Sequence, residues 1–167
     1  MDATKNKVMQ IALKNNQADG SFKNCAGRYA LVAGRFNRAI TDQLVQGATA
    51  ALAGHGIDIA EIDCKWVPGA FEIPMVAKKL VETRRYMAVI ALGAVIRGAT
   101  AHFDFVAGEC ARGIAQLNLQ SDIPVIFGVL TTETLEQAVE RADAKAGNQG
   151  ADYALAALEM VSLLKQL

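Results

Sequence analysis

The chain has 167 residues, in which 17 Lys or Arg balance 17 Asp or Glu. The cations are not clustered. This disfavours a nucleic-acid partner, because a protein neutralises phosphates with a basic patch. An apolar fraction of 52% beside a charged fraction of 20% favours an oligomer, in which part of the apolar surface faces other subunits. Its three cysteines, Cys25, Cys64 and Cys110, form no C-x-x-C pair, which indicates a reducing compartment and no structural zinc.

Residues 1–27 are polar and weakly patterned, and we expect either a flexible arm or an extra strand there. They contain no apolar core of a secretion signal. No run along the chain approaches the roughly 20 apolar residues of a membrane span. The sequence therefore predicts a cytoplasmic protein without a membrane partner, with an arm over residues 1–27 and one domain over residues 28–167.

Short apolar runs alternate with segments of helical period after residue 28. The predicted strands cover residues 29–33, 57–67, 87–92 and 125–130. The predicted helices cover residues 40–55, a segment from Pro74 through Val81, residues 104–119, a segment capped by Thr131 and Thr132 that ends near Gly147, and residues 151–167. Strands that are apolar on both faces and alternate with helices predict an α/β domain, with a four-stranded parallel sheet and helices on both faces.

The carboxyl ends of these four strands should form one rim, which is where open parallel sheets bind ligands. The segments that follow the strands are residues 34–37, 68–72, 93–102 and 127–132. They bring glycines, aromatic rings, a carboxylate, a histidine and arginines together. The topology alone therefore predicts a ligand site at this rim.

The third of these segments carries the most specific chemistry. Gly98, Ala99 and Thr100 place small residues and a hydroxyl just before a helix, where backbone N–H groups and the helix dipole attract an anion. A plain turn with a helix cap explains the same residues equally well. The segment lacks the Lys of a Walker A loop, and no G-x-G-x-x-G follows a strand, so a small phosphorylated ligand fits better than a nucleotide.

His102 follows this anion cradle by two residues, and histidine is the side chain best suited to proton transfer near neutral pH. The alternative is a histidine held by local hydrogen bonds at a helix start. His55, in Gly-His-Gly at a helix end, is interpreted as a solvated turn residue. Because the two histidines are far apart and form no H-x-x-x-H, we expect no metal site.

Further candidates have a structural alternative each. Phe36 and Phe71 lie in glycine-flanked loops and either stack on a planar ring or plug the end of the sheet. Glu72 either accepts hydrogen bonds from ligand hydroxyls or is a first-turn helix carboxylate. For Arg141, the structural alternative is an exposed helical residue that pairs with Gln137 or Lys145 four residues away.

Several motifs in one order resemble the 6,7-dimethyl-8-ribityllumazine synthase family over about residues 28–167. They are RFN at 35–37, WVPGAFEIP at 66–74, GAVIRGATAHFD at 93–104, PVIFG at 124–128, LTTE at 130–133, and ER at 140–141 followed by KAGN at 145–148. The resemblance implies a flavodoxin-like three-layer sandwich. It also implies a transferase of riboflavin biosynthesis that condenses 5-amino-6-(D-ribitylamino)uracil with 3,4-dihydroxy-2-butanone 4-phosphate, releasing phosphate and water without a cofactor.

The same resemblance implies roles for individual residues. Phe36 would stack on the pyrimidine ring, and His102 would move protons. The ribityl chain would be held by Ala70, Phe71 and Glu72, and the ring edge would meet the backbone of Ala94, Val95 and Ile96. The phosphate would be gripped by Ala99, Thr100 and Arg141, with Lys145 as a further substrate-binding residue. Phe127 would be lent by a neighbouring subunit.

The resemblance also implies a homo-oligomer built from pentamers, with active sites shared between adjacent subunits, and it leaves an association with riboflavin synthase open. Asp143 and Gln149 replace a common glycine and lysine of the family in the turn before the last helix, which weakens the expectation for assembly there. The alternative function is a non-catalytic shell-forming scaffold or a flavin-type ligand binder on the same fold. A scaffold would not need Phe36, His102, Arg141 and the anion cradle together.

Overall fold

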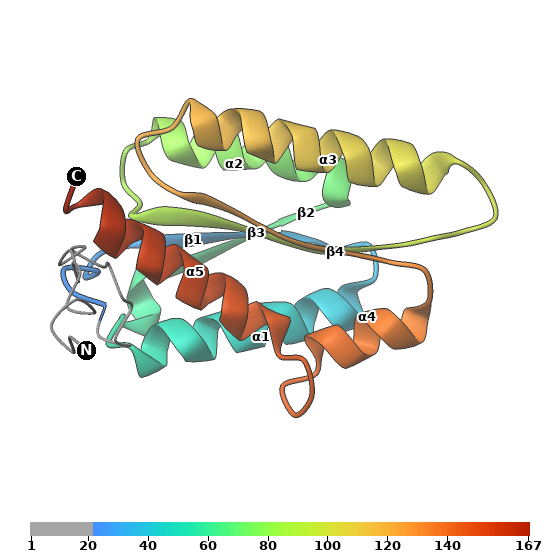
Figure 1. Ribbon diagram of the computed structural model, residues 1–167, viewed down its shortest axis with the longest axis horizontal. Coiled ribbons are helices and arrows are strands. Elements are labelled where there is room, and N and C mark those ends of the chain that lie inside the picture. The colour runs from blue at the N-terminus through green and yellow to red at the C-terminus, as the bar shows by residue number, and fades with distance from the viewer. Residues whose placement is uncertain (1–21) are drawn as a thin grey trace, which may run out of the picture.

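The computed structural model describes residues 22–167 and contains a four-stranded parallel sheet between two layers of helices (Figure 1). The strands are β1 (Tyr29–Gly34), β2 (Ile62–Val67), β3 (Ala88–Ile96) and β4 (Val125–Thr132), in the order β2-β1-β3-β4. The helices are α1 (Arg38–Gly54), α2 (Ile73–Glu82), α3 (His102–Leu119), α4 (Leu135–Ala142) and α5 (Gln149–Leu164), with short 3-10 turns η1 (Ile59–Glu61) and η2 (Ala70–Glu72). The predicted α/β architecture is confirmed.

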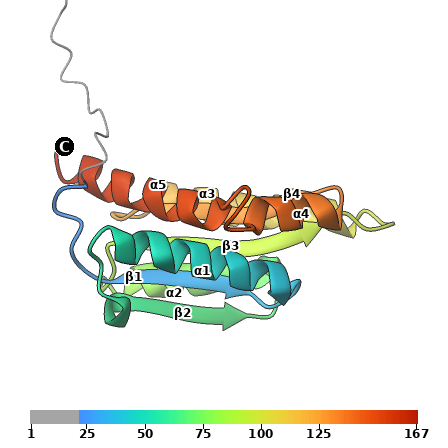
Figure 2. The same cartoon turned by 90° about the horizontal axis from the view of Figure 1, so that it is seen from below.

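Each face of the sheet has its own hydrophobic core. Helices α2 and α3 cover one face, and α1, α4 and α5 cover the other (Figure 1 and Figure 2). Side chains alternate along β1, so Leu31 belongs to the cluster beneath α1 and α5 while Val32 belongs to the cluster beneath α2 and α3. All six residues of β1 are buried. This burial on two sides explains why the central strands are continuous apolar runs in the sequence.

Helices α1 and α5 approach each other through glycines. A Cβ atom added at Gly47 would lie 2.6 Å from Oδ1 of Asn148, and one added at Gly150 would lie 2.9 Å from Cα of Leu44. Because the facing atom at Gly150 is backbone, it cannot move aside as a side chain could. Glycine at position 150 is therefore required by the close approach of the two helices.

The predicted strand over residues 57–67 is too long at its start. Residues Ile59–Glu61 form η1, and the Asp58 carboxylate accepts a hydrogen bond from the Ala60 N–H at 2.9 Å. This local bond gives the backbone an alternative to the sheet, so β2 begins only at Ile62. The alternating apolar pattern did not reveal this turn.

The predicted helix after β4 is wrong at both ends. Thr132 still belongs to β4, where it pairs with Ile96, and the N-cap is Thr134, whose hydroxyl accepts from the Gln137 N–H at 3.2 Å. The helix ends at Ala142 rather than near Gly147. It stops there because Asp143 turns to extended backbone and its carboxylate accepts from the Lys145 N–H at 2.8 Å.

The amino-terminal end of the sheet is joined by a cluster around Asp63 on β2. The Tyr86 hydroxyl donates to its carboxylate at 2.7 Å, and Arg28 donates to the same oxygen at 2.9 Å. The hydrogen bond from Tyr86, followed by that from Arg28, lowers the pKa of Asp63 below its ordinary value. The cluster links the approaches to β1 and β3 with the edge strand β2.

The cysteines lie in different environments and form no disulfide. Cys25 is buried in the cluster beneath α1 and α5, Cys110 is buried beneath α2 and α3, and Cys64 is half-buried on β2. Burial raises the pKa of Cys110 to about 12. The arm or extra strand predicted for residues 1–27 falls mainly on residues 1–21, which lie outside the described residues.

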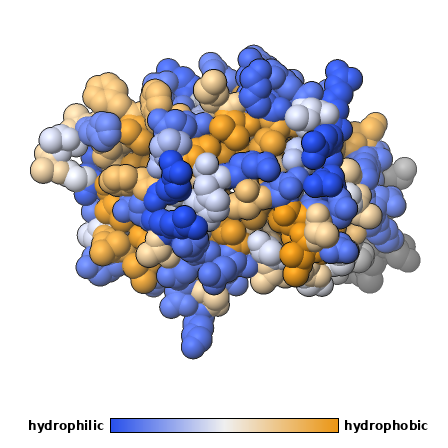
Figure 3. All heavy atoms as spheres, turned by 180° about the vertical axis from the view of Figure 1, so that it is seen from behind, coloured by the Kyte–Doolittle hydropathy of each residue, from blue (hydrophilic) through white to orange (hydrophobic). Residues whose placement is uncertain are grey.

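Several large hydrophobic side chains remain exposed, among them Met75, which is 72% exposed, and Leu135, which is 53% exposed. On the side turned away in Figure 1, hydrophobic residues reach the surface in several patches between hydrophilic ones (Figure 3). Such patches are typical of surfaces that other protein chains cover. Across residues 22–167, no helix is both long and apolar enough to cross a membrane.

Gly150→Ala tests the contact between α1 and α5. We expect it to lower the free energy of unfolding by about 1–3 kcal/mol, because the new methyl group would overlap the Leu44 backbone. Urea unfolding at a fixed protein concentration measures this change. The matched control is Gly108→Ala on α3, where the added Cβ meets nothing within 4 Å. Equal stability of the two variants would show that the helices do not touch at Gly150.

Asp63→Asn tests the cluster at the amino-terminal end of the sheet. A pKa lowered by folding means that the ionised carboxylate stabilises the fold above the ordinary value of 3.8, and that this contribution is lost as the pH falls through the lower folded-state value. We expect a loss on the order of 1 kcal/mol at pH 7, kept small by partial exposure, that shrinks below about pH 4.

Urea unfolding of Asp63→Asn and of the unchanged protein, at pH 7 and below about pH 4, measures how the loss of stability depends on pH. Glu61→Gln is the control. The Glu61 carboxylate is also paired with Arg28, but at 3.7 Å and with 43% of the side chain exposed, so its removal should change stability less. A loss in Asp63→Asn that is independent of pH would contradict the assignment.

Candidate functional site

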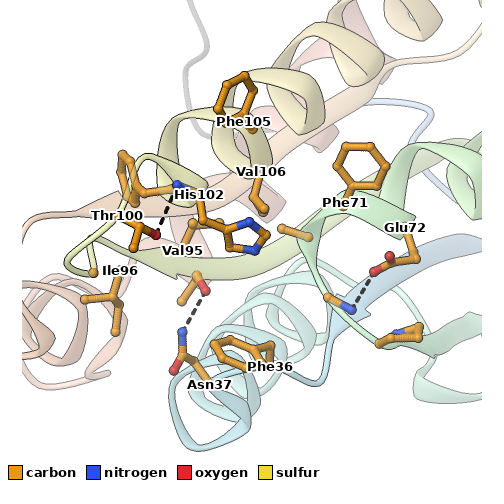
Figure 4. Close-up of a pocket in the computed structure, with 16 residues that line it drawn as sticks. Phe36, Asn37, Phe71, Glu72, Val95, Ile96, Thr100, His102, Phe105 and Val106 are labelled. Carbon is orange, nitrogen blue, oxygen red and sulfur yellow. Dashed lines mark hydrogen bonds between the residues drawn. The ribbon is translucent and has the colours of Figure 1, made fainter.

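A cleft of about 760 Å³ opens at the carboxyl ends of β1, β2 and β3 (Figure 4). Strand order reverses between β1 and β3, and this switch point is where open α/β sheets bind ligands. The walls come from the segments after β1 and β2, the last residues of β3, and the loop and first turns around the start of α3. The predicted rim therefore exists, with three of its four strand ends forming one cavity.

Most of the predicted site residues line this cleft. His102 points inward from the first turn of α3, with Phe36 on one side and Phe71 and Glu72 on the other (Figure 4). The remaining predicted residues in the wall are Ala70, Ala94, Val95, Ile96 and Thr100. Residues that are far apart in the sequence thus meet at one place.

The two loop phenylalanines are exposed rather than packed into the end of the sheet. Phe36 is 73% exposed and Phe71 is 57% exposed. A ring that plugs the sheet would be buried by the strands it closes. Their exposure at the cleft favours the stacking interpretation, because each leaves ring surface available to a planar ligand.

Glu72 has a local role as well as a place in the wall. Its carboxylate accepts a hydrogen bond from the Gly69 N–H at 2.9 Å, within the turn that follows β2 (Figure 4). This bond matches the structural alternative of a carboxylate at a helical first turn. A carboxylate has several acceptor sites, so one backbone bond leaves capacity for ligand hydroxyls.

The loop from Gly98 to Thr100 is exposed throughout. The Thr100 hydroxyl accepts a hydrogen bond from the His102 N–H at 3.4 Å. The N-cap of α3 is Ala101, whose side chain cannot accept from the next N–H groups. Helix starts without such caps offer N–H groups and a positive dipole end to an anion. Ala99, the middle residue of the predicted cradle, does not line the cleft.

Three further predicted residues lie away from the cleft in one chain. Phe127 was expected at the rim, but β4 continues to Thr132, so Phe127 lies within the strand and pairs with Ala91. Arg141 is exposed in the last turn of α4 and donates to the Gln137 carbonyl at 3.3 Å. Lys145 is exposed in the loop between α4 and α5.

Asn37 belongs to the cleft wall but was not among the predicted site residues. Its side-chain amide donates to the Ala94 carbonyl at 3.0 Å, which ties the loop after β1 to the end of β3 (Figure 4). Its backbone is left-handed, with φ of 59°, a conformation that asparagine tolerates better than most residues. An asparagine three residues after the glycine that ends the strand was the available signal for this role.

The ionisable side chains in the cleft wall are Glu72 and His102. In the part of the chain that the structure describes, no group of three or more His, Cys, Asp or Glu residues could hold a metal ion. The cleft thus combines aromatic and apolar walls with one acid, one imidazole and the amino-terminal end of α3. Such a site can orient a planar ligand and transfer protons next to an anion.

One family comparison bears on this cleft. The family model for 6,7-dimethyl-8-ribityllumazine synthase matches residues 26–165. The match covers nearly the whole chain and contains every segment of the cleft wall. The chain therefore belongs to the 6,7-dimethyl-8-ribityllumazine synthase family, a family of transferases in riboflavin biosynthesis.

Proposed function

We propose that this protein condenses 5-amino-6-(D-ribitylamino)uracil with 3,4-dihydroxy-2-butanone 4-phosphate to form 6,7-dimethyl-8-ribityllumazine, phosphate and water. The observation that carries the proposal is the cleft at the β1–β3 switch point, where His102 and the exposed ring of Phe36 face the same cavity in a member of this family. The scaffold and flavin-binder alternatives would not require a proton carrier at that position.

Binding in this proposal relies on surfaces that are open in the cleft. The pyrimidine ring stacks on Phe36, and its edge meets the backbone at Ala94, Val95 and Ile96. The ribityl chain lies along Ala70, Phe71 and Glu72. Holding two substrates in reacting geometry supplies a large part of the rate in such condensations. That is why a site with few ionisable groups suffices.

The chemistry proceeds in three steps. The 5-amino nitrogen attacks the ketone carbonyl, and loss of water gives an imine. Removal of the proton from the neighbouring hydroxyl-bearing carbon expels phosphate, and the resulting enol tautomerises to a new ketone. The ribitylamino nitrogen attacks this ketone and closes the ring with loss of a second water. His102 carries protons between the reacting carbon, nitrogen and oxygen atoms, while the amino-terminal end of α3 near Thr100 stabilises the phosphate as its charge grows.

The phosphate requires a cation that the cleft wall does not contain, since no Lys or Arg is among the residues that line it. We propose that Arg141, with Lys145 and Phe127, reaches this site from a neighbouring subunit of a pentamer. Their exposure supports this role, because all three are available on the surface of one chain. A cytoplasmic location and an association with riboflavin synthase stay predictions.

His102→Ala tests the proposed activity. The unchanged protein mixed with both substrates should yield the fluorescent lumazine and free phosphate. The variant should lose about 10²-fold in kcat, because proton transfer is removed while binding and orientation remain. His55→Ala is the matched control, since the exposed His55 is the C-cap of α1, does not line the cleft, and its ring bonds to the Ala51 carbonyl of its own helix. Absence of both products while both substrates bind would refute the enzyme and favour a scaffold.

Arg141→Ala tests the shared site. The variant should raise KM for the phosphate-bearing substrate by about 10-fold or more and leave KM for the uracil within about 3-fold. Steady-state kinetics with each substrate varied in turn measure both values. Equal losses for the two substrates would refute the phosphate role.

Mixed assemblies of Arg141→Ala and His102→Ala subunits test which chain supplies the arginine. If it comes from a neighbour, some sites in the mixture combine an intact His102 with an intact Arg141. Activity should then exceed the mean of the two pure variants. Activity equal to that mean would place both residues in the same subunit's site.

A further inference from the structure

Arg97, the first residue after β3, joins three segments beside the cleft. Its backbone N–H donates to the Thr132 carbonyl at the end of β4, at 2.9 Å. Its guanidinium donates to both carboxylate oxygens of Asp104 at 3.1 and 3.4 Å, and its Nε lies 2.8 Å from Oε2 of Glu133. The same group lies over the ring of Phe103, 4.1 Å from the centroid.

These contacts hold both ends of the loop over residues 98–101. Arg97 precedes the loop, while Phe103 and Asp104 follow it in the first turn of α3. The loop residues between them are exposed, and a Cβ atom added at Gly98 would meet nothing within 4 Å. Because the loop has so little packing of its own, its shape depends on how its two ends are held.

The positive charge of Arg97 is already neutralised by ion pairs with Asp104 and Glu133. Hydrogen bonds to Asp104 and then Glu133 raise the pKa of its guanidinium. Arg97 does not line the cleft, whereas Phe103, on which it stacks, does. Its influence on a ligand is therefore transmitted through the loop and the start of α3 rather than through direct contact.

We propose that Arg97 is a positioning residue that braces the 98–101 loop and the start of α3, so that Thr100 and His102 keep their places at the cleft. The inference rests on the proposed function, in which this loop receives the substrate phosphate. The side chains of Arg97, Asp104 and Glu133 are 37%, 60% and 62% exposed, and ion pairs this exposed add little to global stability. The brace thus acts on local geometry, and its removal leaves the fold intact.

Replacing Arg97 separates substrate positioning from folding. Arg97→Ala should raise KM for the phosphate-bearing substrate by about 10-fold and change KM for the uracil by less than about 3-fold. For Arg97→Lys, the KM for the phosphate-bearing substrate should lie between those of the unchanged protein and Arg97→Ala. An ammonium keeps the charge but cannot both form the bidentate bond to Asp104 and stack on Phe103. Arg112→Ala on α3 is the matched control: it removes another exposed arginine, 3.4 Å from Glu109, and should leave both values unchanged.

Replacing the carboxylates distinguishes a brace from a direct phosphate ligand. If Arg97 bound the phosphate itself, Asp104→Asn or Glu133→Gln would free its charge and lower KM for that substrate. The brace predicts a higher KM in both variants. It also predicts that Glu133→Gln adds little to the effect of Arg97→Ala, since both remove the same contact.

The two proposals fail in different ways. An active parent protein with an unchanged KM in Arg97→Ala, or a lower KM in the carboxylate variants, overturns the brace. An inactive parent protein overturns the proposed function instead. The brace is then decided by amide hydrogen exchange, which should accelerate over residues 97–107 in Arg97→Ala and stay unchanged in Arg112→Ala. Equal exchange in the two variants overturns it.

Discussion

The parallel pairing of β1 with β3 is the constraint on which the rest of the structure depends. From β1 the chain runs through α1 to the edge strand β2 and returns through α2 to β3. The helices that follow β1 and β3 therefore leave toward opposite faces of the sheet (Figure 1). The loops separate above the paired strand ends, and the cleft is the space between them. Asn37 crosses this gap with its hydrogen bond to Ala94.

Apolar periodicity predicted the four strands and the layering, and the signal is strongest for β1 and β3, which are buried on both faces of the sheet. The errors occurred where short-range hydrogen bonds compete with periodicity. Asp58 turns the chain before β2, and Thr134 and Asp143 set the ends of α4, each through a bond to a nearby N–H. At the start of α4, Thr131, Thr132 and Thr134 are all suitable caps by residue type, and only the three-dimensional path of the chain selects Thr134.

The candidate site was predictable where its residues lie at the carboxyl end of a strand or in the segment that follows it. Phe36, Ala94 and His102 are of this kind, since topology alone brings the carboxyl ends of parallel strands together. Asn37 and Arg97 act through partners 57 and 7 residues away, and nothing in their immediate neighbours specifies those partners. Arg141 lies on α4, outside the cleft wall of one chain, so its proposed contribution depends on how copies of the chain meet.

The placement of the cysteines has a consequence for chemical labelling. Each core cluster contains one buried thiol, Cys25 on one side of the sheet and Cys110 on the other, while Cys64 lies half-buried on β2. Burial raises the pKa of all three thiols, so the reactive thiolate is scarce while the protein is closed. The alkylation rates of Cys25 and Cys110 therefore report how often each of the two helical layers opens, without any engineered cysteine.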